Sequence, residues 1–415
     1  MLARLTIHNG VFIVNHISNA NRLIKDLEDI ELENLLFLSA KYRETGEIAL
    51  SNQILRKILD KFPYHLESWF WLTQQEDLSS DINALRKLEN CLQKIDLYNP
   101  KNSSYIYYAL AKVRESQARY DEAFDLYREA NNQRKCELNL FNTDARIYIG
   151  QSRLHKSLFN SIKKIPNCVL DSTTGQGLIF IIGLPRCGST LVEAILSMAE
   201  NTCCLGESGK LSKVIDQSSI LKLIENEDLD RHHFQKKSSF IDKSYLKEVG
   251  ESLGPKIDKT LNNFYFAGLI SRIWPAAKLI HVQRHPLDQI LSCWKCRFLS
   301  GHSYTLELKD LVRVYISYKQ LMDFWNKELG DRIYTCQYEE LVSNPLKETK
   351  KLAQFCFLPW TESLLTPEKT KLLIKTASYN QVREPINTHS VKGWERFSNH
   401  LDTYVQQLLD SHVIL

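Results

Sequence analysis

The sequence predicts two folds in one chain: an all-helical domain, followed by an α/β domain in which helices flank a parallel sheet. The first third, from about residue 32 to 132, has helical periodicity almost without glycine. After it come short apolar runs of strand length, namely LIFIIG at 178–183, KLIHVQ at 278–283 and a weaker RIYTCQY at 332–338. Alternation of such runs with helical patterns is typical of a parallel sheet whose ligand binds at the carboxyl ends of the strands.

The helical region carries a repeating pattern that resembles three degenerate tetratricopeptide repeats. The clearest unit lies at 105–134, and its apolar positions recur at the spacing of a helix pair: Tyr107, Leu110, Ala111, Ala123, Tyr127 and Ala130. A set of ordinary amphipathic helices is the alternative. The polar stretch that follows ends in STTGQG at 172–177 and is typical of a connecting loop. We therefore expect a helical domain over 1–165 and the α/β domain over 166–415.

Composition excludes several classes of protein. The 415 residues are 43% hydrophobic and 25% charged, and a net charge of +4 does not indicate a nucleic-acid binder. The ten cysteines are scattered, and the one C-x-x-C, Cys293 to Cys296, lacks a second pair, so we expect reduced thiols and no metal site. No run approaches the roughly 20 apolar residues of a membrane span, and residues 1–17 do not resemble a signal peptide. We expect a cytoplasmic protein.

The first strand leads into a glycine-containing loop, in the stretch GLIFIIGLPRCGST from Gly177 to Thr190. Gly183 and Gly188 keep the spacing of a P-loop that binds nucleoside triphosphates, but Ser189 stands where that loop has its lysine. The cation of this loop is instead Arg186. Backbone amides, a helix N-terminus and an arginine suit a tetrahedral oxyanion, whereas the missing lysine argues against ATP chemistry.

Two further stretches place polar and charged side chains at the edge of the expected sheet where the anion loop lies. CCLGES, at 203–208, places Glu207 near the anion loop, either as a general base or as an ion-pair partner that organises Arg186. In RHPLDQILS, Arg284 follows the second strand and Ser292 lies two helical turns later, so both can reach one phosphate. We expect Cys293 and Cys296 in this helix to be packed thiols rather than a redox pair.

Together these motifs resemble the sulfotransferases that use 3'-phosphoadenosine-5'-phosphosulfate (PAPS), especially their tetratricopeptide-containing members and the tyrosylprotein sulfotransferases. The resemblance spans about residues 177–400. GLPRCGST matches the family's 5'-phosphosulfate loop, with Cys187 in place of the usual hydroxyl residue, and RHPLDQILS matches its 3'-phosphate motif. The resemblance implies these donor-binding residues from the two motifs: Arg186, Cys187, Gly188, Ser189, Thr190, Arg284 and Ser292.

The resemblance extends to the catalytic groups and to a segment that covers the donor. Glu207 matches the family's catalytic glutamate, and Lys259 matches a lysine that contacts the transferring sulfuryl group. SYNQVREPINTHSVKGW, from 378 to 394, matches the covering segment, in which Ser378 faces the phosphosulfate, and Tyr338 borders the nucleotide. This chain departs from the pattern at two places: Gly393 and Cys296 stand where basic residues are common. Lys392 and Arg396, and Arg297 beside the cysteine, are the candidate substitutes.

The resemblance implies metal-free sulfuryl transfer from PAPS as co-substrate to a hydroxyl or amine acceptor. Arg186 and Lys259 would stabilise the transition state with help from Ser378, and Glu207 would take the acceptor's proton. The acceptor itself, whether a protein tyrosine, a glycan or a small metabolite, is not encoded in a motif. We expect the helical repeats to bind a protein partner or to self-associate rather than to take part in the chemistry.

Two other functions compete with this interpretation. A nucleotide kinase or GTPase would need the missing lysine and a magnesium-binding aspartate. A tetratricopeptide binding scaffold with an inactive transferase domain remains the alternative, although Arg186, Glu207, Lys259 and Arg284 are all retained.

Overall fold

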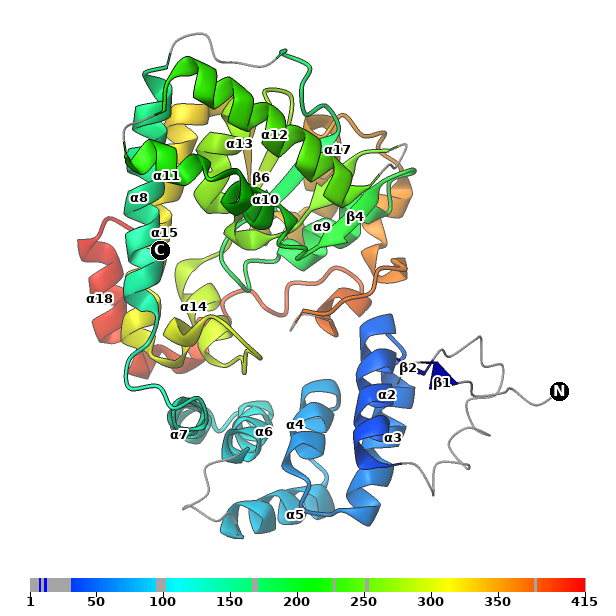
Figure 1. Ribbon diagram of the computed structural model, residues 1–415. Coiled ribbons are helices and arrows are strands. Elements are labelled where there is room, and N and C mark those ends of the chain that lie inside the picture. The colour runs from blue at the N-terminus through cyan, green and yellow to red at the C-terminus, as the bar shows by residue number, and fades with distance from the viewer. Residues whose placement is uncertain are drawn as a thin grey trace, which may run out of the picture.

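The computed structural model of the chain has an α/β domain and a helical domain, which lie one above the other in Figure 1. It describes residues 31–94, 102–165, 171–226, 229–250, 254–376 and 379–414, together with a small hairpin of β1 (Ile7–His8) and β2 (Val11–Phe12). Among the described residues, no helix is both long and apolar enough to cross a membrane.

Among the described residues, the helices of the helical domain are α2 (Leu32–Thr45), α3 (Ile48–Lys61), α4 (Leu66–Gln75), α5 (Ile82–Gln93), α6 (Ser103–Ser116) and α7 (Tyr120–Glu137). Helix α2 packs on α3, α3 on α4, and each of α4, α5 and α7 on α6. Most of the apolar positions that suggested repeats are buried, including Ala111, Ala123 and Ala130, none of which is exposed at all. This confirms the all-helical region. Its assignment to tetratricopeptide repeats stays a prediction.

The α/β domain is built on a five-stranded parallel sheet with the order β4-β5-β3-β6-β7. The strands are β3 (Leu178–Ile182), β4 (Cys203–Gly206), β5 (Lys256–Asp258), β6 (Lys278–Gln283) and β7 (Ile333–Gln337). The three predicted apolar runs are therefore β3, β6 and β7. The sequence did not reveal β5, because a strand of three residues is too short to show a periodicity. Since β5 pairs with β3, it separates β4 from β3.

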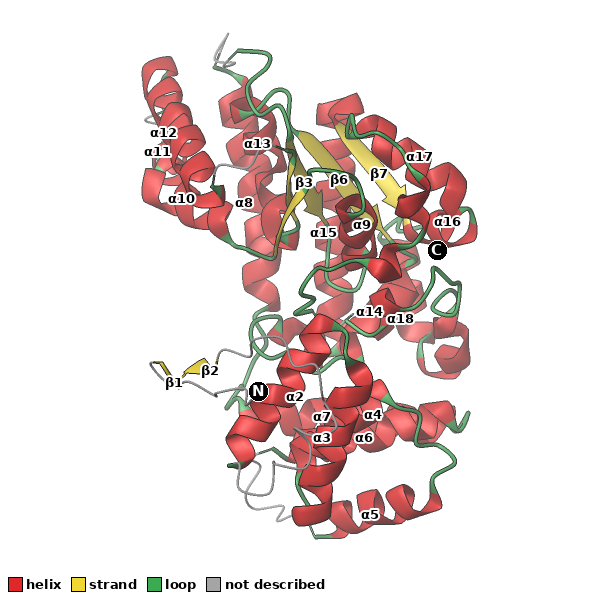
Figure 2. Ribbon diagram, turned by 90° about the vertical axis from the view of Figure 1, so that its right-hand side faces the viewer, coloured by secondary structure: helices red, strands yellow, loops and turns green. Residues whose placement is uncertain are grey.

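Helices cover both faces of this sheet (Figure 2). The α-helices of this domain are α8 (Ala145–Lys163), α9 (Ser189–Ser197), α10 (Lys210–Ser218), α11 (Ile220–Glu225), α12 (Arg231–Val249), α13 (Ala267–Ile273), α14 (Pro286–Trp294), α15 (Leu308–Leu329), α16 (Tyr338–Ser343), α17 (Pro345–Phe355) and α18 (Asp402–Asp410). Short 3-10 helices connect them: η2 (Leu261–Phe266), η3 (Ser303–Leu306), η4 (Gly330–Arg332), η5 (Glu362–Leu365), η6 (Pro367–Lys369), η7 (Gln381–Arg383) and η8 (Gly393–His400).

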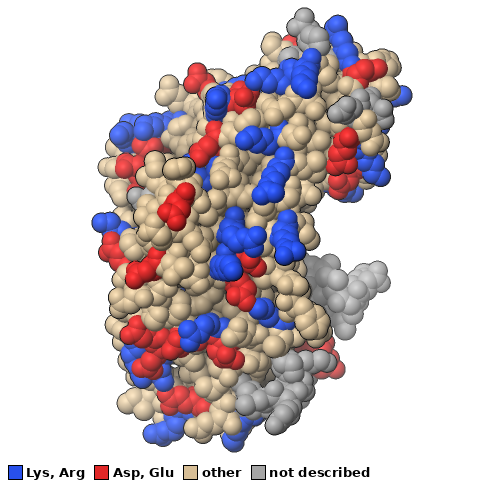
Figure 3. All heavy atoms as spheres, turned by 90° about the vertical axis from the view of Figure 1, so that its left-hand side faces the viewer, with Lys and Arg blue, Asp and Glu red and all other residues tan. Residues whose placement is uncertain are grey.

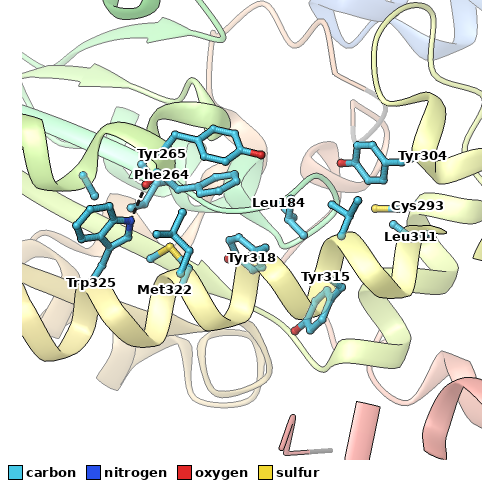
Figure 4. Packing of buried hydrophobic residues seen from close by; sticks show 14 of the residues in the cluster. Leu184, Phe264, Tyr265, Cys293, Tyr304, Leu311, Tyr315, Tyr318, Met322 and Trp325 are labelled. Atoms are coloured by element: carbon cyan, nitrogen blue, oxygen red, sulfur yellow. Dashed lines mark hydrogen bonds between the residues drawn. The ribbon is translucent and has the colours of Figure 1, made fainter. Parts of the chain in front are cut away.

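Successive residues of β3 enter two different apolar cores, as the two-residue period of a strand requires. Ile179 and Ile181 pack with residues of α9 and α17 on one face. Phe180 and Ile182 enter a larger core on the other face. Figure 4 shows part of that larger core, where Trp325 of α15 donates from Nε1 to the carbonyl oxygen of Phe264 in η2 at 2.9 Å.

The larger core continues into the helical domain, so the two domains pack tightly against each other. The centre of the Phe124 ring in α7 lies 4.6 Å from the centre of the Trp294 ring at the end of α14. Asn131 Nδ2 donates to the carbonyl oxygen of Trp294 at 3.0 Å. Helix α8, which the sequence placed in the helical domain, packs along α15 beside the sheet (Figure 1).

One face of the molecule carries basic and acidic side chains in mixture (Figure 3). This mixture agrees with the small net charge of +4. Within the described parts of the chain, no group of three or more His, Cys, Asp or Glu residues could hold a metal ion.

Candidate active site

The loop between β3 and α9 forms the centre of the candidate site. Two of its residues have left-handed backbone conformations: Arg186 with φ 65° and Gly188, the residue that caps α9, with φ 101°. These turns bring the loop amides and the N-terminus of α9 to the carboxyl end of the sheet, which is the arrangement that binds oxyanions. For a residue with a Cβ atom such as Arg186, a positive φ is strained, and strain of this kind is concentrated at functional sites.

Helix α14 holds the loop in this shape from behind. Gln289 Nε2 donates to the carbonyl oxygens of Leu184 at 3.1 Å and Pro185 at 3.0 Å. Arg186 Nε donates to Ser292 Oγ at 2.9 Å. The two predicted donor-binding residues Arg186 and Ser292 are therefore in direct contact.

Among the predicted donor-binding residues of the loop, Cys187 is the one that does not line the cleft. The thiol is fully buried in the core beside α9, and burial raises the pKa of Cys187 to about 11. A thiol in this position is neutral and inert. Cys187 can contribute to anion binding through its backbone amide but not through its side chain.

Arg284, which follows β6, is buried and joins three parts of the site. Its Nη1 donates to the carbonyl oxygen of Arg186 at 3.1 Å, and its Nη2 donates to that of Ser390 at 2.6 Å. Its guanidinium carbon lies 4.9 Å from the centre of the Tyr338 ring. The same ring packs on Gly188, where a Cβ atom would come within 2.5 Å of Tyr338 Cδ2.

Glu207 and Lys259 meet at the ends of the adjacent strands β4 and β5. Lys259 Nζ lies 2.9 Å from Glu207 Oε1 and 3.5 Å from Glu193 Oε2. The sequence left open a pairing of Glu207 with Arg186, but the partner in the structure is Lys259. The reason is topological: β5 lies between β3 and β4, so the residue after β5 is the nearer cation. Glu193, on α9, was not anticipated from the sequence.

Residues near the C-terminus lie against the anion loop. Thr376 Oγ1 lies 3.2 Å from Thr190 Oγ1, and Gln381 Oε1 accepts a hydrogen bond from Arg186 Nη2 at 3.2 Å. The predicted residue Ser378 lies outside the described residues. Ser189, the remaining loop residue of the prediction, begins α9 and lines the same cleft.

Lys392 does not bring its ammonium group to the cleft. Its side chain is exposed, and its backbone N–H donates to Asp288 Oδ2 at 2.8 Å. The residue that follows Gly393, Trp394, stacks its ring on His285 at 5.5 Å between centres. Among the basic residues near this segment, Arg396 lines the cleft and Lys392 does not.

Arg297 lines the cleft, but its guanidinium is held by groups of the helical domain. Its Nε donates to Ser104 Oγ at 2.9 Å, and its Nη2 donates to Glu137 Oε2 at 3.2 Å, both in the helical domain. Its guanidinium also lies over the ring of Tyr105. Arg297 therefore fastens the two domains together, and Cys296 lines the cleft beside it.

The anion loop, Glu207 and Arg284 line one cleft of about 930 Å³. The α/β domain contributes the anion loop, Glu207, α14 and the C-terminal segment. The helical domain contributes a wall that includes Arg43, Trp71, Lys112 and Glu115. The sequence did not predict this wall, because no motif marks residues that come together only when two domains pack.

The fold and the cleft define an α/β protein whose glycine-containing loop, suited to an oxyanion, lies at the carboxyl end of a parallel sheet beside a carboxylate and a buried lysine. Residues 179–362 match the model of the family described as "Sulfotransferase family". The chain thus carries a sulfotransferase family domain, as the motifs implied.

The chain is also similar to individual proteins. An uncharacterised protein of Aquifex aeolicus is 28% identical over 354 residues, which cover 81% of this chain and 45% of that protein. Protein-tyrosine sulfotransferase 1 of Danio rerio is 24% identical over 241 residues, which cover 52% of this chain and 65% of that protein. The chain thus spans less than two thirds of the length of either relative.

The solved structures with a similar fold include the sulfotransferase domain from the olefin synthase of Synechococcus PCC 7002. It is 19% identical with a TM-score of 0.42, and the match covers 59% of this chain and 98% of that one.

Proposed function

We propose that this protein transfers a sulfuryl group from PAPS to a hydroxyl or amine of an acceptor. One observation carries the proposal: the Arg186 loop and Glu207, which is paired with the buried Lys259, line the same cleft in a domain of the sulfotransferase family. The first supplies an oxyanion site, and the second supplies a base with a cation beside it. These are the two requirements for moving a charged group onto a protonated nucleophile.

The residues of the cleft fit the two ends of the donor. The amides of 186–190 and the Arg186 guanidinium suit the 5'-phosphosulfate, because both are preorganised donors at a helix N-terminus. Arg284 suits the 3'-phosphate. Its Nε is buried and has no hydrogen-bond partner among the described residues, so it has a donor to offer.

In the proposed reaction, the acceptor oxygen or nitrogen forms a bond to sulfur while the bond from sulfur to the phosphate oxygen breaks. Glu207 accepts the proton that the acceptor loses. Arg186 and Lys259 stabilise the negative charge on the sulfuryl and leaving oxygens. Ser378 is a further donor in this proposal. The acceptor is a protein tyrosine, a glycan or a small metabolite, and it contacts both walls of the cleft.

Substitution of Glu207 tests the proposal against the alternative of an inactive scaffold. Glu207→Gln keeps the shape of the side chain but removes its basicity. We expect turnover to fall at least about a hundredfold while the affinity for 3'-phosphoadenosine-5'-phosphate stays within a few-fold of wild type. Affinity is measured by calorimetry, with and without a chelator, and turnover with labelled donor and a panel of peptides, glycans and metabolites.

Glu248→Gln is the matched control, because Glu248 also pairs with a lysine, Lys213 at 2.8 Å, but lies outside the cleft. Glu248→Gln should change neither turnover nor the affinity for 3'-phosphoadenosine-5'-phosphate. Binding that requires a metal, or that prefers ATP, would overturn the proposed donor. Near-normal turnover of Glu207→Gln would remove Glu207 from the mechanism.

A further inference from the structure

Lys259 lies between two carboxylates that differ in their exposure to solvent. The Lys259 side chain is 2% exposed. Its nearer partner, Glu207, is 50% exposed and lines the cleft, whereas Glu193 is 8% exposed and lies on α9 behind the sheet edge. One buried cation thus has a partner that can reach a substrate and a partner that cannot.

Glu193 is itself held in a fixed position. Its Oε1 accepts a hydrogen bond from the backbone N–H of Gly206 at 3.1 Å, and Gly206 directly precedes Glu207. Its helix, α9, begins at the anion loop. The Glu193 carboxylate therefore links the helix of the anion loop, the strand end that bears Glu207, and Lys259.

We infer that Glu193 is a positioning residue whose carboxylate is the permanent counter-charge of Lys259, so that Glu207 can leave the ion pair and accept a proton. The inference rests on the proposed function, in which Glu207 is the base. A base must become neutral when it takes the acceptor's proton. If Glu207 were the sole partner of Lys259, that step would leave a buried ammonium without a counter-charge, which is strongly unfavourable.

The neighbouring titratable groups cannot replace Glu193. Burial raises the pKa of Cys204, so its thiol stays neutral. Burial lowers the pKa of His302, although Asp144 and Glu207 oppose this effect. Asp258 is committed elsewhere, since it accepts hydrogen bonds from Tyr245 Oη at 2.8 Å and from the backbone N–H of Thr260 at 2.9 Å.

Opposing effects act on the ionisation of the Glu193 carboxyl, and their net result is a raised pKa. Burial raises the pKa of Glu193, while Lys259 and the Gly206 amide act in the opposite direction by favouring the carboxylate. The Lys259 ammonium therefore stabilises the negative charge that the inference assigns to Glu193.

The test is Glu193→Gln, which retains an oxygen for the Gly206 amide but removes the charge. Lys259 then pairs with Glu207 alone, and the repulsion between the two carboxylates is lost. Both changes favour the ionised form of Glu207. We expect the Glu207 carboxyl to titrate at lower pH, as measured by carbon-13 NMR on glutamate-labelled protein. Its resonance is assigned as the one missing from Glu207→Gln.

A weaker base should also slow transfer. We expect kcat to fall on the order of tenfold, the acid limb of the pH–kcat profile to move to lower pH, and donor affinity to change little. The matched control is Glu348→Gln, because Glu348 is equally buried and pairs with Lys351 at 2.7 Å far from the cleft. Glu348→Gln should lower the melting temperature but leave both the Glu207 titration curve and the pH–kcat profile where they are in the wild type.

The two readouts separate failure of this inference from failure of the proposed function. An unchanged Glu207 titration in folded Glu193→Gln would overturn the inference, whether or not transfer is observed. If Glu193→Gln shifts the Glu207 titration but the wild-type protein transfers nothing from PAPS, the inferred role of Glu193 as counter-charge stands and the proposed function is refuted.

Discussion

Gly188 determines the shape of the anion loop at the scale of a single residue. Its φ of 101° lies in a region that a residue with a Cβ atom rarely adopts, and a Cβ atom there would also collide with Tyr338. Both conditions require glycine. The neighbouring Arg186 is in a similar conformation without being glycine, so the loop already contains one strained residue.

We expect Gly188→Ala to weaken the binding of 3'-phosphoadenosine-5'-phosphate and to lower stability by about 1–3 kcal/mol, because the backbone must shift to relieve the strain and the clash. Calorimetry and urea unfolding measure the two effects. Gly150→Ala, on the exposed face of α8 with nothing within 4 Å of its added Cβ, is the control and should be neutral or slightly stabilising. Wild-type affinity in Gly188→Ala would contradict the assignment of the loop.

The segment from 370 to 384 is the element that connects the anion site to the helical domain. The backbone N–H of Ile374 donates to the carbonyl oxygen of Glu44 at the end of α2, at 3.0 Å. Arg383 donates to the carbonyl oxygens of Thr370 at 2.5 Å and Leu372 at 2.7 Å. Its side chain also packs closely on Gly46.

We expect Arg383→Ala to lower donor affinity on the order of tenfold, because the loss of these hydrogen bonds loosens a segment that touches Thr190 and Arg186, and tenfold corresponds to about 1.4 kcal/mol. The control is Lys371→Ala, which removes an exposed cation from the same segment. Equal affinity in both variants would show that the segment does not cover the donor.

At the scale of the whole molecule, the two domains share an ionic contact next to the cleft. Lys295 Nζ lies 2.6 Å from Glu115 Oε1, and Tyr127 Oη donates to Glu115 Oε2 at 2.8 Å. Burial alone would raise the pKa of Glu115, but Lys295, Lys112 and these hydrogen bonds outweigh it and lower the pKa to about 2. A truncated chain that begins after residue 165 would lack this contact and would also lose α8 from the side of α15.

A lowered pKa means that the ionised carboxylate stabilises the folded state above the ordinary glutamate pKa of 4.5, and that this stabilisation disappears as the pH falls toward about 2. The shift corresponds to about 3 kcal/mol. We expect Glu115→Gln to be less stable than wild type by that order at pH 7, with the difference shrinking below about pH 4.5. Urea unfolding of both proteins between pH 7 and pH 3 measures it, and a constant difference would contradict the assignment.

Local patterns in the sequence were sufficient for much of the fold and the site. The strands β3, β6 and β7 have enough apolar residues to be recognised, and the glycines of the anion loop are required by backbone geometry that depends on a few adjacent residues. Arg186 and Ser292, which the motifs assigned to one donor, are in contact in the structure.

Tertiary structure alone decided which residues of separate segments meet. Glu207 pairs with Lys259 because β5, a strand too short to predict, lies between β3 and β4. Arg297 binds Glu137 of the helical domain, and Glu193 reaches Lys259 from helix α9. Such contacts depend on strand order and domain packing, which are set by the burial of apolar surface over the whole chain. A motif records only the residues that are adjacent in sequence, and therefore cannot specify them.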